Sequence, residues 1–165
     1  MNLNLKGKKA LIMGSSDGIG KAIAISLLAE GVEVCLNSRT ESKLQKTKDE
    51  IGAQHFIATD LTKPGAGSAL IQKAKSLLGQ IDILITNTGG PAKNNFADVT
   101  SEQWQTDFQS LWMSPVDAIK AALPDMASNN FGRILMVTSI AAKEPLAGLT
   151  TSNGLRAGLP GLARS

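Results

Sequence analysis

The sequence predicts an α/β fold in which a parallel sheet lies between two layers of helices. Short apolar runs alternate along the chain with segments of helical periodicity. The apolar runs are continuous rather than alternating with polar residues, which is typical of strands that are buried on both faces. A strand–helix repeat of this kind predicts a doubly wound parallel sheet in a three-layer α/β/α arrangement.

Each element follows from its own residues. The expected strands are Ala10–Met13, Val32–Asn37, His55–Thr59, Ile81–Thr86 and Arg133–Val137. The expected helices are Lys21–Glu30, Ser42–Ile51, Ala69–Leu78, Ser101–Ala122 and Ser152–Ser165. Ser101 is the expected N-cap of the long helix, and Pro115 is expected to kink it. We treat residues 1–165 as a single domain.

Composition excludes several classes of protein. The chain has 165 residues, 42% of them hydrophobic and 19% charged, with a net charge of +3. The basic residues are scattered without interleaved aromatic residues, so nucleic-acid binding is not expected. No apolar run is long enough to span a membrane, and the start of the chain lacks a secretion signal. Cys35 lies in an apolar strand, so we expect a buried thiol, a cytoplasmic setting and no metal site.

The most informative segment is the glycine-rich turn Gly14-Ser15-Ser16-Asp17-Gly18-Ile19-Gly20. It follows an expected strand and opens a helix, whose N-terminal N–H groups and positive dipole end attract an anion. A phosphate-loop NTPase would need G-x-x-x-x-G-K-[ST], and Ser15 and Ala22 break that pattern. The turn therefore favours a Rossmann-type site for a phosphate-bearing ligand, with a purely structural turn as the alternative.

Polar or glycine-rich clusters follow every expected strand. They are the Gly14 turn, Asn37-Ser38-Arg39, Asp60-Leu61, Asn87-Thr88-Gly89-Gly90 and Ser139. Because the carboxyl ends of parallel strands meet at one edge of a sheet, these clusters are expected to share a single rim. Ligands of such sheets bind there.

In this ordered set of motifs the chain resembles the short-chain dehydrogenase/reductase family. The glycine motif of the family appears as Gly14 to Gly20, and its N-N-A-G motif appears as Asn87-Thr88-Gly89-Gly90. Its strand-four signature matches Ile81-Asp82-Ile83-Leu84-Ile85, and its active-site serine matches Ser139. Within the family, the chain is most similar to the 3-oxoacyl-carrier-protein reductases.

The resemblance implies where a dinucleotide would bind. The pyrophosphate and the adjacent ribose would lie on the glycine turn, at Gly14, Ser16, Asp17, Gly18, Ile19 and Gly20. Asp60 and Leu61 would contact the adenine, while Asn87 and Gly89 would lie near the adenosine ribose. The alternative for Asp60 is a helix cap or a turn residue.

The end of the second strand bears on the choice of dinucleotide. An acidic residue there would bind a ribose 2′-hydroxyl and repel a 2′-phosphate. This chain has Asn37, Ser38 and Arg39 instead, and Arg39 can form charge-assisted hydrogen bonds with a 2′-phosphate. NADP is therefore favoured over NAD. A solvated surface charge remains the alternative for Arg39.

The chain departs from the family at the acid catalyst. Family members carry a Y-x-x-x-K motif, and the matching positions here are Ser152 and Arg156. The sequence contains no tyrosine at all. A phenol can protonate a developing alkoxide, whereas a serine hydroxyl is a much weaker acid. We expect Ser139, Ser152 and Arg156 to line the catalytic site, with the helix N-cap as the alternative for Ser152.

The resemblance also implies further strands beyond Ser165, so we expect a truncated product or fragment whose last strand is an exposed edge. Helices 101–122 and 152–165 are expected to pack against a second subunit. Trp104, Phe108, Trp112 and Met113 are expected in the core or at that interface.

The sequence is compatible with two functions. The first is an NADP-dependent oxidoreductase that acts on a small carbonyl or alcohol substrate. The second is a dinucleotide-binding remnant without turnover. A serine hydrolase is disfavoured because Ser139 lacks the G-x-S-x-G turn and the single histidine, His55, begins a strand far from the rim.

Overall fold

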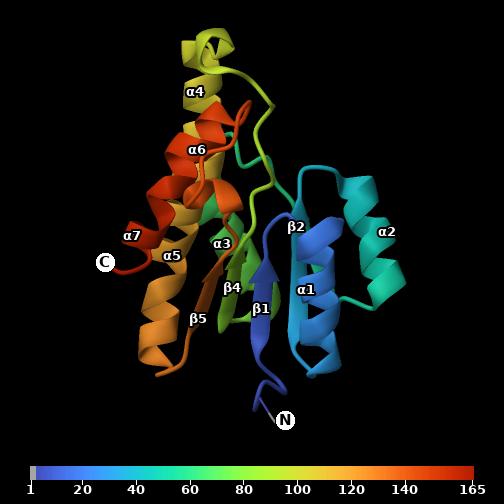
Figure 1. Ribbon diagram of the computed structural model, residues 1–165. Helices are drawn as coiled ribbons and strands as arrows, with labels where there is room; N and C mark the ends of the chain where they lie inside the picture. The colour runs from blue at the N-terminus through green and yellow to red at the C-terminus, as the bar shows by residue number, and fades with distance from the viewer. Residues whose placement is uncertain (1–2) are drawn as a thin grey trace.

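The computed structural model describes residues 3–165, and its centre is a five-stranded parallel sheet (Figure 1). The strands stand in the order β3-β2-β1-β4-β5, and every pair is parallel. Their bounds are β1 (Lys9–Ile12), β2 (Glu33–Ser38), β3 (His55–Ala58), β4 (Ile83–Thr86) and β5 (Arg133–Met136). The expected doubly wound sheet is confirmed, with strand bounds that differ from the predicted ones by one or two residues.

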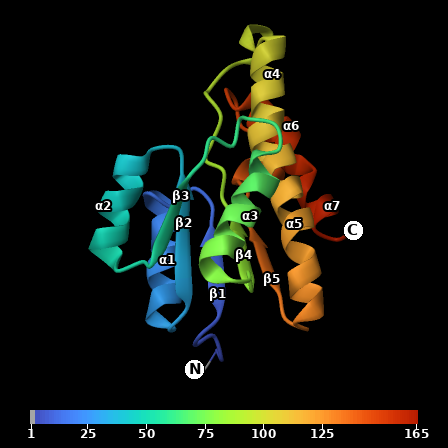
Figure 2. The same ribbon diagram turned by 180° about the vertical axis from the view of Figure 1, so that it is seen from behind.

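The described residues form seven α-helices. They are α1 (Gly18–Ala29), α2 (Glu41–Ile51), α3 (Ala66–Leu78), α4 (Ser101–Phe108), α5 (Ser114–Ser128), α6 (Thr150–Ala157) and the short α7 (Leu159–Leu162). Helices α3 and α5 lie on the face that is turned to the viewer in Figure 2, and α1 lies on the other. No helix among the described residues is long and apolar enough to cross a bilayer.

The strand pleat divides the core between the two faces, because successive side chains point to opposite sides. Leu11 and Leu84 pack with Leu70 of α3 in one cluster. Ile12 and Ile85 pack on the opposite side in a second cluster. Cys35 is fully buried, and burial raises the pKa of its thiol to about 12. The predicted buried cysteine is confirmed.

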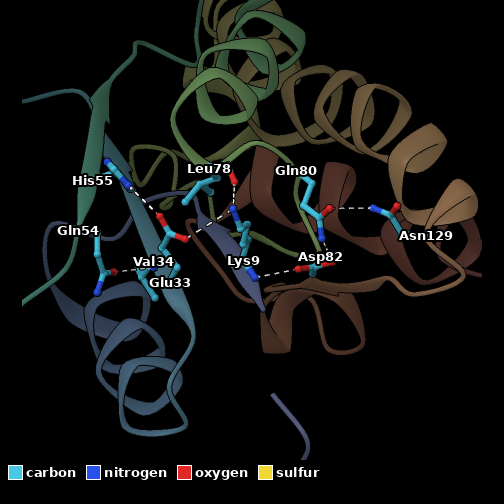
Figure 3. Close-up of polar contacts among 9 residues, drawn as sticks. All are labelled: Lys9, Glu33, Val34, Gln54, His55, Leu78, Gln80, Asp82 and Asn129. Carbon is cyan, nitrogen blue, oxygen red and sulfur yellow. Dashed lines mark hydrogen bonds and ion pairs between the residues drawn. The ribbon is translucent and has the colours of Figure 1, made fainter. Parts of the chain in front are cut away.

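A belt of polar contacts crosses the amino ends of the strands, opposite the expected rim (Figure 3). The Lys9 N–H donates to Asp82 Oδ2 at 2.9 Å, and the Lys9 ammonium contacts the Leu78 carbonyl and Glu33. His55 Nε2 lies 3.0 Å from Glu33 Oε1. Gln80 donates to Asp82 and accepts from Asn129 of the α5 end. His55 thus contacts Glu33 at the end of the sheet away from the rim, where the sequence predicted it to lie.

The long helical region differs from its prediction. The N-cap is Thr100, whose hydroxyl accepts from the Gln103 N–H at 3.2 Å, so the expected Ser101 cap is wrong by one residue. A π-helical turn, Gln109–Met113, separates α4 from α5. Pro115 has no N–H to donate, and it follows this widened turn as one of the first residues of α5 rather than kinking a continuous helix.

The C-terminal region forms two helices in place of the single helix predicted over 152–165. Helix α6 starts at Thr150, so Ser152 lies inside its first turn and is not its N-cap. A separate short helix, α7, contains Pro160 near its start, where the missing N–H costs no hydrogen bond. Strand β5 forms one edge of the sheet, and its Leu135 side chain is 51% exposed.

Candidate functional site

A cavity of about 580 Å³ opens at the carboxyl ends of the strands, and its volume lies within the usual range for small-ligand sites. Every predicted cluster except Ser139 contributes to its lining. Of the predicted dinucleotide residues, Gly14, Ser16, Asp17, Gly18, Ile19, Ser38, Arg39, Asp60, Leu61, Asn87 and Gly89 line it. The structure therefore brings together four of the five predicted clusters, as a shared rim requires.

The glycine turn is closely packed on its inner side and open on its outer side. Gly14 has a φ of +58°, and a Cβ there would lie 2.3 Å from the Asn87 carbonyl oxygen. A Cβ on Gly20, which is buried beneath the turn, would lie 2.2 Å from the Gly14 carbonyl oxygen. Gly18 also has a positive φ, +54°, but nothing lies within 4 Å of its Cβ position. The turn thus leaves its cavity side free for a ligand.

The N-terminus of α1 faces the same cavity. Its N-cap, Asp17, makes no side-chain capping bond, and the first turn contains no acidic residue. The first N–H groups of this twelve-residue helix are therefore not used by a cap. Asp17, Gly18 and Ile19 line the cavity at that point. An anionic group of a ligand is stabilised in such a place by the free N–H groups and the helix dipole.

Two buried residues of the predicted clusters, Ser15 and Asn37, fix the position of the turn. The Ser15 hydroxyl donates to the Ile12 carbonyl at 2.7 Å and accepts from the Asn37 N–H at 2.9 Å. Asn37 Nδ2 donates in turn to the Ile57 carbonyl at 2.9 Å. These bonds tie the ends of β1, β2 and β3 together. Their sequence signal was a polar residue at the end of an apolar strand.

A basic wall follows β2. Arg39 and Lys43 both line the cavity, and neither forms an ion pair among residues 3–165. Lys43 was not predicted; it lies in the first turn of α2, which begins two residues after Arg39. The buried hydroxyl oxygens of Ser38 and Thr59, in the same lining, have no hydrogen-bond partner in the described chain. This wall can accept a polyanionic group.

Asp60 lines the cavity and also shapes its own turn. Its Oδ1 accepts from the Thr62 N–H at 3.0 Å and from the Thr62 hydroxyl at 2.8 Å. The backbone N–H of Thr62 is the main reason that the pKa of this carboxyl lies below its usual value. The turn role left open for Asp60 is therefore present, and its contact with adenine stays a prediction.

Asn87 supports the glycine turn directly. Its Nδ2 donates to the Gly14 carbonyl at 2.9 Å, so the end of β4 holds the turn that follows β1. Gly89, two residues on, has a φ of +70° and lies beside the cavity.

The far wall of the cavity belongs to α4 and the π-helical turn, which lie outside the clusters predicted at the strand ends. Gln103, Thr106, Asp107, Ser110 and Leu111 line this wall. Asp107 is 4% exposed, and its Oδ1 accepts from Gln103 Nε2 at 2.7 Å. The Ser114 hydroxyl donates to the Leu61 carbonyl at 2.7 Å and so fastens this wall to the end of β3.

The three residues predicted to be catalytic lie outside the cavity lining. Ser139 is half-buried, and its hydroxyl accepts from the Ala141 N–H at 3.2 Å at the start of a short 3₁₀ turn. Ser152 and Arg156 are buried on α6. The Arg156 guanidinium donates to the carbonyls of Val137 and Gly89, and burial lowers its pKa below the usual value. The catalytic roles of these three residues stay predictions.

Among residues 3–165, no three His, Cys, Asp or Glu side chains are grouped so that they could hold a metal ion. Trp104 and Trp112, two of the predicted core or interface aromatics, are half-buried beside α6. Phe108 stacks on Trp112 with ring centroids 6.4 Å apart and is 43% exposed.

Comparison with known proteins agrees with this geometry. The chain is 42% identical over 149 residues to an uncharacterized oxidoreductase, YvrD, of Bacillus subtilis, covering 88% of this chain and 56% of the relative. It is 33% identical to the NADPH-dependent reductase BacG of the same organism, covering 92% of this chain and 61% of the relative. The chain thus spans little more than half the length of these relatives.

A solved structure shows the same fold. A 3-oxoacyl (acyl-carrier-protein) reductase from Agrobacterium tumefaciens with NADP bound superposes with a TM-score of 0.91 at 29% identity, covering 96% of this chain and 62% of that one. The likeness to 3-oxoacyl reductases inferred from the motifs is thereby confirmed. The family model for short chain dehydrogenases matches residues 8–165. This chain belongs to the short chain dehydrogenase family.

Proposed function

We propose that this chain forms the dinucleotide-binding part of an NADPH-dependent oxidoreductase that interconverts a small carbonyl compound and its alcohol. The proposal rests on one observation: an open glycine turn, a helix N-terminus without a side-chain cap and the basic wall all line one cavity. The NADPH-dependent relative and the NADP-bound structural neighbour support the choice of cofactor.

The residues present fit a phosphorylated dinucleotide. The turn from Gly14 to Gly18, with the N-terminus of α1, would hold the pyrophosphate, because its N–H groups are not used by a cap and its outer side is open. Arg39 and Lys43 would hold the 2′-phosphate, since both cations line the cavity without ion-pair partners in the described chain. When bound, the nicotinamide supplies the hydride.

The source of the proton that the reaction needs has to be considered separately from the hydride. A carbonyl reduction must deliver a proton to the developing alkoxide, and positioned acids of this kind contribute about 10²- to 10⁴-fold to the rate. The Ser139 hydroxyl, which accepts from the Ala141 N–H, keeps its own proton to donate toward a substrate oxygen. The guanidinium of Arg156 stays charged and donates to two backbone carbonyls, so it is not a proton donor for the substrate.

The test is a titration of the purified chain with NADPH and, in parallel, with NADH, followed by nicotinamide fluorescence. We expect saturable binding with NADPH preferred, and then slow oxidation of NADPH by a 3-oxoacyl thioester or another small ketone. Failure of both dinucleotides to saturate the signal would refute the proposal.

A second candidate is dinucleotide binding without turnover. The sequence contains no tyrosine, and Ser152, which stands in its place, is 4% exposed. A single-turnover experiment with the protein in excess over NADPH separates the two candidates, because tight binding without loss of the reduced nicotinamide over a panel of ketones favours the second.

We also propose that the chain associates with itself through α4, α5 and α6. The half-exposed Phe108 on α4 and the apolar groove beside α5, lined by Ile119, Leu123 and Leu162 among others, support this, since an extended apolar surface is typical of an interface. Sedimentation of the wild-type chain and of Phe108→Glu tests it. We expect an oligomer for the first and a smaller species for the second, and a monomeric wild-type chain would contradict the proposal.

A further inference from the structure

One wall of the cavity is a segment without helix or strand structure of its own. We call residues 89–94 the wall loop; its first four residues, Gly89, Gly90, Pro91 and Ala92, line the cavity. A loop of this kind keeps a fixed shape only if its backbone groups are bonded elsewhere. The bonds that hold the wall loop come from residues 148–156, which lie far along the chain.

The outer end of the wall loop is bonded at the start of α6. The Asn94 N–H donates to the Gly148 carbonyl at 2.9 Å. The Thr150 hydroxyl donates to the Asn94 carbonyl at 3.0 Å. The Thr150 N–H also donates to the Asn94 carbonyl, at 3.5 Å, and together with the bond from Asn94 to Gly148 this makes an isolated parallel bridge between Asn94 and Leu149.

The inner end of the wall loop is bonded by Arg156, which is 6% exposed. One guanidinium nitrogen donates to the Gly89 carbonyl, and another donates to the Val137 carbonyl at 3.1 Å. The side chain therefore bridges the loop after β4 and the segment after β5. No carboxylate in the described part of the chain forms an ion pair with Arg156, so these carbonyls are the partners that the structure gives its charge.

The other side of α6 packs against the opposite wall of the cavity. A Cβ on Gly154 would lie 3.4 Å from the Trp104 ring, and a Cβ on Gly158 would lie 2.8 Å from the Trp112 ring. These tryptophans belong to α4 and the π-helical turn, whose residues Gln103 and Ser110 line the cavity. Helix α6 thus lies in contact with both walls without lining the cavity itself.

We propose that Arg156 is a positioning residue that sets the distance between the two cavity walls, so that dinucleotide affinity depends on a guanidinium that is outside the cavity lining. The inference rests on the proposed dinucleotide binding. It gives Arg156 a different task from a direct ligand of the cofactor, because both of its recorded bonds end on backbone carbonyls.

The experiment measures NADPH dissociation constants for four variants of the full chain. Arg156→Met removes both bonds, and Thr150→Val removes only the side-chain bond to Asn94. Each is expected to weaken NADPH binding, the first about tenfold. Arg156→Lys keeps the charge but cannot span both carbonyls as a planar fork does, so its affinity is expected between wild type and Arg156→Met. Arg164→Met, an exposed arginine beyond α7, is the matched control and should bind like wild type.

Amide hydrogen exchange supplies a readout that needs no ligand. We expect Arg156→Met and Thr150→Val to lose protection in the wall loop while β1 and β4 keep theirs. If Arg156→Met does not fold, both NADPH affinity and amide exchange are measured on Thr150→Val alone. Failure of the wild-type chain to bind NADPH would count against the proposed function, and the exchange comparison would still decide the positioning role.

The inference is overturned by either of two results. The first is that Arg156→Met and Thr150→Val both fold and bind NADPH with wild-type affinity. If the wild-type chain does not bind NADPH, the corresponding result is wild-type amide exchange in the wall loop of both variants. The second is an Arg156→Lys variant that binds NADPH as tightly as wild type or more tightly, since that outcome assigns the position a direct contact with the cofactor.

Discussion

The side chain of Asn87 donates from Nδ2 to the backbone carbonyl of Gly14 at 2.9 Å, and this bond joins the end of β4 to the turn after β1. The two backbones also approach so closely that a Cβ on Gly14 would lie 2.3 Å from the Asn87 carbonyl oxygen. The glycine turn is therefore held from the side as well as from its own strand and helix.

This contact predicts that Gly14→Ala is far more damaging than an alanine at an open glycine. Both Gly14 and Gly52 have positive φ, so alanine costs about 1 kcal/mol at each from backbone conformation alone. At Gly14 the clash with backbone adds about 1–3 kcal/mol. Urea unfolding of the two variants measures the difference, and equal losses would show that the Asn87 contact carries no weight.

Asn87→Ala tests the same contact by removing the side chain that donates the hydrogen bond. Loss of the bond to Gly14 is expected to lower the free energy of unfolding by about 1 kcal/mol. NADPH affinity should fall as well, because the turn that lines the cavity loses its lateral support. Asn95→Ala, an exposed residue whose Nδ2 lies 3.4 Å from Asp98, is the control. Unchanged stability and affinity in Asn87→Ala would contradict the assigned role.

The basic wall predicts a selective loss of NADPH binding. Arg39→Ala and Lys43→Ala should each weaken NADPH about tenfold while leaving NADH unchanged, because only NADPH carries the charged 2′-phosphate that they are expected to meet. The effect should shrink at high salt. Lys46→Ala is the control, because Lys46 lies on α2 with Lys43 but outside the cavity lining. Parallel losses for NADPH and NADH would assign the wall to another part of the ligand.

Burial of Cys35 predicts a loss of stability in alkaline solution. Its thiol has a pKa of about 12 in the folded chain and 9.0 as its ordinary value, so the folded state favours the protonated form. This contribution is constant below about pH 9, and it declines as the pH rises toward 12 because the unfolded chain releases the proton first. The free energy of unfolding measured against pH should therefore fall more steeply in wild type than in Cys35→Ala. Identical slopes would show that the thiol does not titrate differently in the two states.

Much of the fold could be predicted because local pattern and tertiary structure agree. The continuous apolar residues of β1 and β4 are buried on both faces, as their composition requires. The rim could be predicted for the same reason, since parallel strands place their carboxyl ends together. The glycine turn, Arg39 and Asn87 all line one cavity.

The remaining features depend on contacts that a single sequence does not display. The π-helical turn sits where Pro115 lacks a donor, and the sequence pattern there is equally compatible with a kinked α-helix. The far wall at Asp107 and Ser110 is fastened near the rim by tertiary contacts, such as the bond from Ser114 to the Leu61 carbonyl. The partners of Arg156 are backbone carbonyls, which carry no residue-specific signal.

The polar belt at the amino ends of the strands has a consequence for how such a protein changes over evolutionary time. Lys9, Glu33 and Asp82 fix the alignment of neighbouring strands at the end of the sheet that is remote from the cavity. Residues at the rim can therefore be exchanged while the strands keep their pairing. Loss of chemistry and loss of folding become separable events, and lineages that share this sheet are free to diverge in what they bind and convert.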